Sequence, residues 1–332
     1  MSAITVCLTE PTSDTMQPGL SAGAIALAAG PQAPTGVQTI TRSASLAAAA
    51  RSVPQWSTSF SRLAVAAVSA LRVAATRSAA TAAKANELKL VDHCGTDLAA
   101  AARDADLVIV CTPVGACGEA AKAIAPALKP GCIVSDVGSV KQAVIADMKP
   151  HIPAGVHFVP AHPVAGTENS GPDAALLDLF EGRHCILTPL PDSDAAAADK
   201  LEAFWKALGS EVDRIDPANH DRILAITSHL PHLIAYTIVG TADDLGGHLN
   251  SEVLKYAAGG FRDFTRIASS DPTMWRDVFM NNREAVLEVL QRFQEDLFYL
   301  QRAIRWGEGD KLFELFTRTR EIRRALIHLN QA

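Results

Sequence analysis

Side chains that can exchange a proton or bind an acid lie in separate segments of this sequence. His162 lies in the turn-rich segment VPAHPVAGTENSGP, which holds it in a stiff loop. Ser228 and His232 in TSHLPHLIAY are four residues apart and share one helix face. Arg266 lies in GGFRDFTRIASSDP, and arginine suits bidentate recognition of a carboxylate. The alternatives are structural: a histidine that only packs locally, and arginines that pair with nearby aspartates.

These residues need elements to position them, and the sequence predicts an α/β domain. Apolar runs bounded by turn residues are typical of buried parallel strands, and helical segments alternate with them. Strands are expected over 71–76, 105–114, 131–139, 156–163, 184–190 and 210–216, and helices over 78–90, 118–129, 140–148 and 194–209.

Ligands of open parallel sheets bind beyond the carboxyl ends of the strands. Three loops are expected there, and they carry Thr112 with Pro113, Ser139, and His162. Thr112 and Pro113 are candidates to lie along the ribose of a cofactor. The three loops together predict a site at this edge of the sheet.

After residue 216 the apolar pattern changes to the period of a helix. Asp216 and Pro217 are typical of a helix start, and the first helix is expected to run toward Val239. A second helix is expected over 272–306 and a third over 310–329. A helix of that length predicts packing against a partner chain.

The first part of the chain is different in composition. The first 57 residues contain only four charged groups and show neither helical nor strand periodicity. We therefore expect a low-complexity, poorly ordered or aberrant segment over 1–60, a nucleotide-binding domain over 61–216 and a helical domain over 217–332.

Composition excludes several classes of protein. The net charge of −6 and the pI near 5.9 argue against a nucleic-acid surface. The six cysteines show no spacing typical of zinc, so no metal site is predicted. No apolar run predicts a membrane span, and no basic segment typical of a secretion signal is seen. A cytoplasmic protein with reduced thiols is expected.

Five segments, in order, carry a family resemblance: GSVK, HPVAGTENSGP, LFEGRHCILTP, SHLPH and GGFRDFTRIASSDPTMWRD. Over about residues 70–330 the chain resembles the prephenate/arogenate (cyclohexadienyl) dehydrogenases of tyrosine biosynthesis. The resemblance implies a Rossmann-like, mostly parallel sheet domain followed by an all-helical dimerisation domain. It also implies NAD or NADP as cofactor, prephenate or arogenate as substrate, and a homodimer.

The resemblance also implies roles for individual residues. His162 would take the proton from the ring hydroxyl of the substrate, and Ser139 would hydrogen-bond that hydroxyl and the histidine. Arg266 would bind a substrate carboxylate. Ser228 and His232 would line the same pocket. Glu168 would be a gating acid at the mouth of the pocket, and Trp275 would lie near the dimer contact.

One feature departs from the family pattern. No GxGxxG turn occurs in the sequence, so the first βα unit is expected to be degenerate or missing. Thr76 stands where the second strand of the family ends in an acid, and Arg77 and Ser78 follow it as candidate cofactor ligands that would favour NADP. The alternative functions are a cofactor-less remnant that keeps only fold and dimer, and another Rossmann dehydrogenase for a small hydroxy acid. A frame shift in the coding sequence would explain the missing turn.

Overall fold

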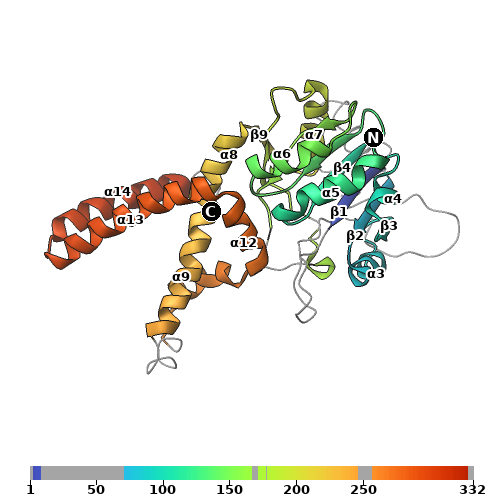
Figure 1. Cartoon of the computed structure of the whole chain (residues 1–332). Helices are drawn as coiled ribbons and strands as arrows, with labels where there is room; N and C mark the ends of the chain where they lie inside the picture. Colours follow the sequence, from blue (N-terminus) through green and yellow to red (C-terminus); the bar gives the residue numbers. More distant parts are fainter. Residues whose placement is uncertain (1–2, 9–70, 167–170, 177, 246–255, 328–332) are drawn as a thin grey trace, which may run out of the picture. The chain divides into compact units, whose positions relative to one another are not determined.

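The computed structural model describes residues 3–8, 71–166, 171–176, 178–245 and 256–327 (Figure 1). The chain forms two compact units, which divide between Asn282 and Arg283. The first unit contains both sheets and the helices up to α12, and the second contains α13 and α14. The domain boundary at residue 216 stays a prediction.

Six parallel strands form the main sheet, in the order β3-β2-β1-β4-β5-β6. This is the order typical of a dinucleotide-binding sheet, with its switch point between β1 and β4. The predicted Rossmann-like domain is therefore confirmed. The strands are β1 (Ala3–Leu8), β2 (Leu71–Thr76), β3 (His93–Gly95), β4 (Leu107–Cys111), β5 (Ile133–Asp136) and β6 (His157–Phe158).

The strand β1 corrects the sequence prediction for the first residues. Ala3–Leu8 pairs with β2 over its length and with β4 from Ile4 onward, although no strand was expected there. The segment AITVCL is a short apolar run, typical of a strand buried on both faces, which the unpatterned residues after it obscured. The first strand of the fold is thus present, and residues 9–70 lie outside the described residues.

A second, three-stranded sheet consists of β7 (Ala161–Pro163), β8 (His184–Leu187) and β9 (Glu211–Arg214). The single strand predicted over 156–163 was wrong, because β6 and β7 belong to different sheets. Pro160 separates them, since it has no N–H to continue a ladder, and its carbonyl accepts a hydrogen bond from Thr188 N at 2.9 Å. This turn places His162 opposite Ile186 of β8.

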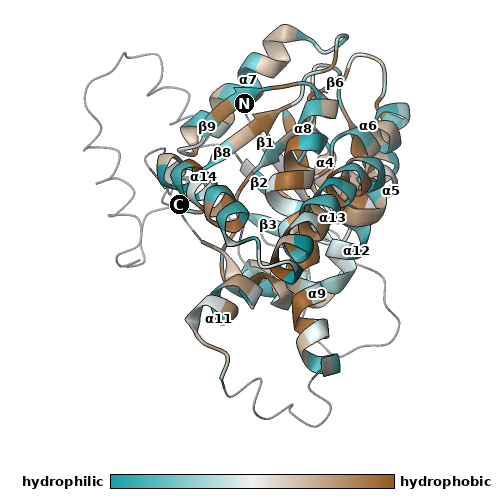
Figure 2. Cartoon of the chain, turned by 90° about the vertical axis from the view of Figure 1, so that its left-hand side faces the viewer, coloured by the Kyte–Doolittle hydropathy of each residue, from teal (hydrophilic) through white to brown (hydrophobic). Residues whose placement is uncertain are grey.

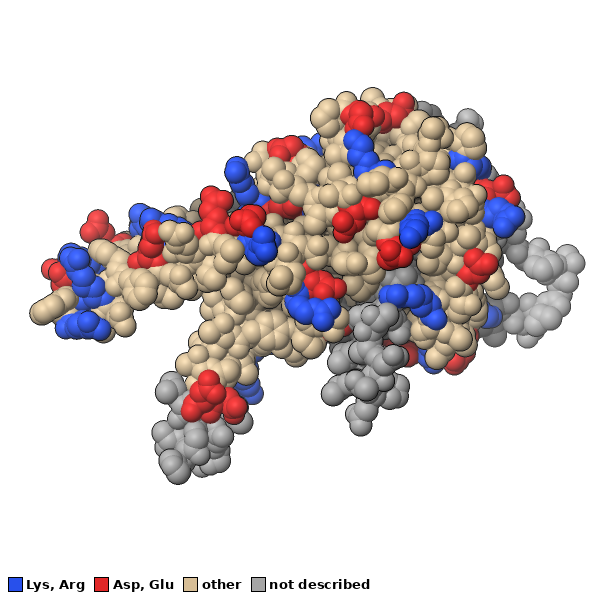
Figure 3. Space-filling model, in the orientation of Figure 1, with Lys and Arg blue, Asp and Glu red and all other residues tan. Residues whose placement is uncertain are grey.

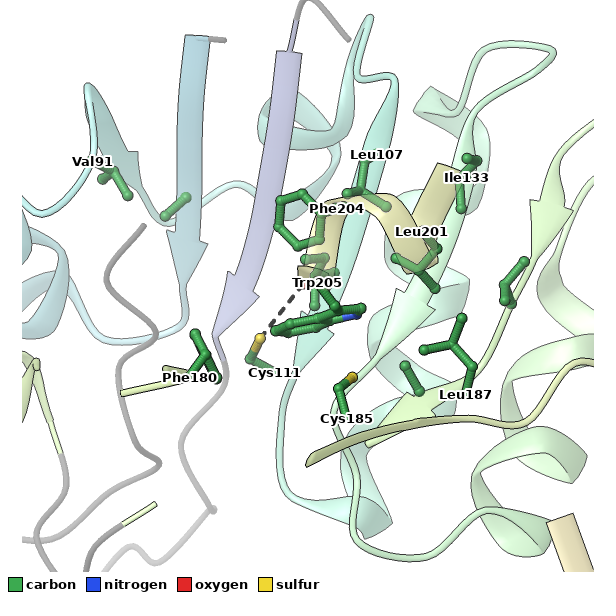
Figure 4. Close-up of a cluster of buried hydrophobic side chains, with 14 of the residues drawn as sticks. Val91, Leu107, Cys111, Ile133, Phe180, Cys185, Leu187, Leu201, Phe204 and Trp205 are labelled. Carbon is green, nitrogen blue, oxygen red and sulfur yellow. Dashed lines mark hydrogen bonds between the residues drawn. The ribbon is translucent and has the colours of Figure 1, made fainter. Parts of the chain in front are cut away.

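Helices cover both faces of the main sheet. Leu107, Ile109 and Cys111 of β4 lie in one apolar cluster with α7, and Val108 and Val110 lie in another with α5 and α6, as alternation along a strand requires. Figure 4 shows the first cluster, with Trp205 and Phe204 of α7 over the sheet. The helices of this part are α3 (Ala79–Glu87), α4 (Leu98–Ala102), α5 (Cys117–Ile124), α6 (Gln142–Met148) and α7 (Ala195–Ala207).

The helices after β9 begin as predicted. Asp216 caps α8 (Pro217–Leu224) by accepting hydrogen bonds from Ala218 N and Asn219 N at 3.1 and 3.0 Å. A π-helical turn, η5 (Ala225–His229), separates α8 from α9 (Leu230–Leu245). Such turns are frequent at functional sites.

The single helix predicted over 272–306 was wrong. It is broken into α12 (Pro272–Asn281) and α13 (Arg283–Arg305) at Asn282, whose φ of −114° and ψ of 32° are not helical. The buried amide of Asn282 bonds to α8 and η5, which accounts for the break. Two shorter elements precede α12, namely α11 (Gly259–Thr265) and η6 (Arg266–Ser269).

The second unit is a pair of contacting helices, α13 and α14 (Gly309–Ile327). It carries many exposed apolar side chains, and apolar colour also marks α9 in Figure 2. The continuous helical stretch Pro217–Asp244 is long and apolar enough to cross a membrane. Its most apolar 18-residue window has a mean hydropathy of 1.4, and 28% of that window is buried. A core helix can have the same length and hydropathy. In this stretch His220 and Asp221 are buried and hydrogen-bond to β7 and to the start of α6.

Candidate active site

A chain of three buried side chains starts from His162 on β7. Nδ1 of His162 lies 2.9 Å from Nε2 of His220, and Nδ1 of His220 lies 2.8 Å from Oδ1 of Asp221. Both His220 and Asp221 belong to α8 and are 0–1% exposed. The strand and the helix therefore present an imidazole, a second imidazole and a carboxylate in line.

The pKa of His162 is shifted well below its ordinary value. Burial is the main cause, and the neighbouring His220, Lys141 and His229 add to it. Burial also lowers the pKa of His220, against the opposing effect of Asp221. Both imidazoles are therefore neutral near pH 7, as a base that accepts a proton must be.

Asp221 is held as a carboxylate by four donors, one of which is the side-chain amide of Gln142 at 3.3 Å. Its Oδ1 accepts from Lys141 N at 2.7 Å and its Oδ2 from Gln142 N at 2.9 Å, in addition to the bond from His220. Burial would raise the pKa of Asp221, but these hydrogen bonds outweigh it and lower that pKa. Asp221 thus satisfies the first N–H groups of α6 from another helix.

A buried ion pair supports the loop between β5 and α6. The ammonium of Lys141 contacts Asp136 and donates to the carbonyl of Ala161 at 2.6 Å, and Lys141 and Asp136 are both 0% exposed. Asp136 also accepts from Gly138 N at 2.8 Å. A Cβ at Gly138 would lie 3.0 Å from that carboxylate, so a larger residue would crowd this turn. This network joins the loop that carries Ser139 to β7, which carries His162.

Ser139 lies in this loop, half-buried, but no hydrogen bond joins it to His162 among the described residues. The ring partner of His162 is His220 instead. The structure thus brings the loop of Ser139 next to β7, which carries His162, without the hydrogen bond between them that the resemblance implied.

A second group of aromatic side chains surrounds His229 and His232. His232 stacks on Trp275 with ring centroids 3.6 Å apart, and its Nδ1 donates to Ser228 O at 2.9 Å. Trp275 is buried, at 7% exposure, and supports His232 within the chain. Asn282 lies 3.1 Å from Nδ1 of His229 and donates to Asp221 O at 2.9 Å. Burial lowers the pKa of His229 to about 4.

Arg266 begins η6 and is exposed. Burial is the main cause that lowers the pKa of His232, and the hydrogen bond to the Ser228 carbonyl opposes it. The positive charge of Arg266 lowers this pKa further, so its guanidinium lies near the ring. The structure therefore brings Arg266, His232 and Ser228 to one region of the first unit. Glu168 lies outside the described residues.

Two parts of the main sheet carry the candidate residues for a dinucleotide, namely the end of β4 and the end of β2. The switch point between β1 and β4 fits a dinucleotide, because sheets with this strand order bind dinucleotides there, beyond the carboxyl ends of the strands. Pro113 is half-buried there, whereas the hydroxyl of Thr112 is engaged by Pro113 O at 3.2 Å and by the Cys117 thiol at 3.3 Å. The residues after β1, where a glycine-rich turn belongs, lie outside the described ones.

The end of β2 provides the other candidate cofactor residues. Thr76 is fully buried, Arg77 is exposed, and Ser78 caps α3 by accepting from Thr81 N at 3.1 Å. An exposed arginine at a helix start fits a phosphate group. No group of three possible metal ligands occurs among the residues that the structure describes.

Sequence reasoning missed the residues that support the site, namely His220, Asp221, Lys141, Asp136 and Asn282. A signal for one of them existed: His220 and Leu224 are four residues apart and share the buried face of α8. That spacing places a histidine in the core, where it needs a partner. Nothing in the sequence indicated that the partner would be His162.

The strand order and the buried histidines beside the sheet define a protein of the dinucleotide-binding Rossmann class. Profiles of two families match the chain: "Prephenate dehydrogenase, nucleotide-binding domain" over residues 72–214 and "Prephenate dehydrogenase, dimerization domain" over 216–318. The chain therefore belongs to the prephenate dehydrogenase family.

Individual relatives agree with this assignment. The chain is 42% identical over 243 residues to the cyclohexadienyl dehydrogenase of Zymomonas mobilis, covering 73% of this chain and 83% of that protein. It is 31% identical over 246 residues to the prephenate dehydrogenase of Bacillus subtilis, covering 74% of this chain and 66% of the relative.

A solved structure is also similar. The prephenate dehydrogenase of A. aeolicus, in complex with hydroxyphenyl propionate and NAD+, matches with a TM-score of 0.72 and 32% identity, over 77% of this chain and 89% of that one.

Proposed function

We propose that this chain catalyses the oxidative decarboxylation of prephenate to 4-hydroxyphenylpyruvate, of arogenate to tyrosine, or of both, with hydride transfer to NAD or NADP. The observation that carries the proposal is His162, a buried imidazole kept neutral on β7, next to the carboxyl end of β5 of the Rossmann sheet. Relatives named cyclohexadienyl and prephenate dehydrogenase support it.

The reaction needs a base at the ring hydroxyl of the substrate. His162 takes the hydroxyl proton while the hydride on the same carbon leaves, so a ring ketone forms. The ketone accepts the electron pair of the breaking carbon–carboxylate bond, and carbon dioxide departs as the ring becomes aromatic. The nicotinamide cofactor supplies the hydride acceptor when bound.

Binding and orientation of the substrate fall to the helical segment. Arg266 binds a substrate carboxylate, and Ser228 and His232 line the same pocket beside it. The stacking of His232 on Trp275 fixes the position of this ring. A guanidinium orients a carboxylate through paired hydrogen bonds and does not act as the base. Ser139 hydrogen-bonds the ring hydroxyl, and Glu168 gates the pocket.

NAD or NADP would be held at the switch point between β1 and β4. Pro113 and Thr112 would hold it on the β4 side, and Arg77 and Ser78 would hold it at the end of β2. Arg77 would favour the 2′-phosphate of NADP over the ribose hydroxyl of NAD.

A second function has one observation in its favour. The sequence contains no GxGxxG, so a catalytically impaired family member that keeps only fold and dimer is the alternative. Fluorescence titration with NAD and NADP distinguishes the two, because the impaired protein binds neither.

The assembly that fits this function is a homodimer formed through the helical segment. The matching family profile is described as a dimerization domain, and α13 and α14 expose large apolar side chains. Basic and acidic side chains are interspersed on the face drawn in Figure 3. A nucleic-acid partner would need basic side chains gathered in a patch, so none is proposed. A cytoplasmic location without a membrane partner suits such an enzyme.

The variant His162→Asn tests the proposed base. Asparagine keeps a polar side chain of similar size, so substrate affinity is expected to stay nearly intact while turnover falls about 10²–10⁴-fold. Turnover within a few-fold of the parent would exclude His162 as the base. The matched control is His93→Asn, which changes an exposed histidine on β3.

A further inference from the structure

The hydrogen-bond chain behind the proposed base has a fixed direction. The Asp221 carboxylate is acceptor only, so Nδ1 of His220 must donate to it. A neutral His220 then has its lone pair on Nε2, which accepts from Nδ1–H of His162. This leaves the lone pair of His162 on Nε2, and no described residue hydrogen-bonds that atom.

We propose that His220 is a positioning residue, which holds His162 in the tautomer whose Nε2 can accept the substrate proton. Its link to Asp221 then stabilises the imidazolium that forms. This inference rests on the proposed function, since it assigns how the base of that reaction is prepared. A hydrogen bond to the far nitrogen is what fixes the tautomer of a histidine.

The other titratable groups around His162 neither fix its tautomer nor stabilise its protonated form. Lys141 is bound to Asp136 and to the carbonyl of Ala161, and His229 receives its hydrogen bond from Asn282. Both groups act against a positive charge on His162. The carboxylate of Asp221, through His220, is therefore the counter-charge for the protonated base.

Asp221 itself is a poor site for the test, because it also satisfies the backbone of α6. His220 offers two complementary substitutions. In His220→Gln the side-chain oxygen replaces Nε2 and still accepts from His162, while the donor to Asp221 is lost. In His220→Asn the amide replaces Nδ1 and still donates to Asp221, while the acceptor for His162 is lost.

The experiment combines steady-state kinetics with nitrogen-15 NMR of the histidine side chains, using the full chain without ligand for the spectra. In the parent, His162 is expected as the Nδ1–H tautomer. His220→Gln should keep this tautomer and lose about tenfold or less in kcat. His220→Asn should lose the tautomer and lower kcat about 10²-fold or more, with KM nearly unchanged in both.

Two results would overturn the inference. One is an unchanged tautomer of His162 in His220→Asn. The other is an equal loss of kcat in both variants that follows a loss of thermal stability, as expected if His220 only packs. An inactive parent whose His162 is still the Nδ1–H tautomer would instead contradict the proposed function and leave the tautomer assignment supported.

Discussion

The substitution Lys141→Met tests whether the buried ion pair holds the site together. Lys141 and Asp136 are fully buried, and the ammonium also binds the carbonyl of Ala161. Methionine fills similar volume but leaves the Asp136 charge with only backbone donors from Gly138 and Ala161. Breaking a buried pair in this way costs about 3–5 kcal/mol. That is a large part of the total stability of a typical domain.

Urea unfolding and thermal scans measure the effect. At about 2–4 °C per kcal/mol, the midpoint should fall by roughly 6–20 °C. The matched control is Lys149→Met, whose partner Asp192 is exposed and whose loss should cost about 1 kcal/mol or less. The double variant Lys141→Met with Asp136→Asn should recover part of the loss, because no unpaired charge remains. A midpoint for Lys141→Met equal to that of the control would refute this reasoning.

Three further predictions follow from the site and the second unit. Arg266→Ala should raise KM about ten- to a hundredfold and Arg266→Lys should recover only part of it, whereas a lower melting temperature with normal KM would mean a structural role. Burial lowers the pKa of His162 and His229, so below about pH 6.5 the unfolded state binds more protons than the folded state. The free energy of unfolding, measured in urea, should therefore fall from pH 7 toward pH 4. A free energy that stays constant over this range would contradict the prediction. Phe313→Asp on exposed α14 should convert a dimer to a monomer in sedimentation, and a parent that is already monomeric would exclude the proposed assembly.

Much of the fold followed from local patterns in the sequence. The apolar run of β4 and the Asp216-Pro217 helix start both lie where they were predicted. The pattern failed where tertiary contacts decide. Asn282 breaks a continuous apolar stripe because its side chain bonds to Asp221 and His229, which are distant in sequence.

The site was predictable only in part, for the same reason. His162, Ser139 and Arg266 stand in distinctive segments, and a motif can point to such residues. His220 and Asp221 belong to an ordinary helix, and their role depends on the packing of α8 against β7 and α6. The strand β1 was missed because six apolar residues next to an unpatterned segment carry little periodicity.

The most direct test of the central claim is an assay of the purified chain with prephenate and arogenate, each with NAD and NADP. We expect at least one pair to yield one reduced nicotinamide and one carbon dioxide per substrate, with His93→Asn active and His162→Asn nearly inactive. No turnover with any pair, together with no binding of either nucleotide, would contradict the account and identify the chain as an impaired member of its family.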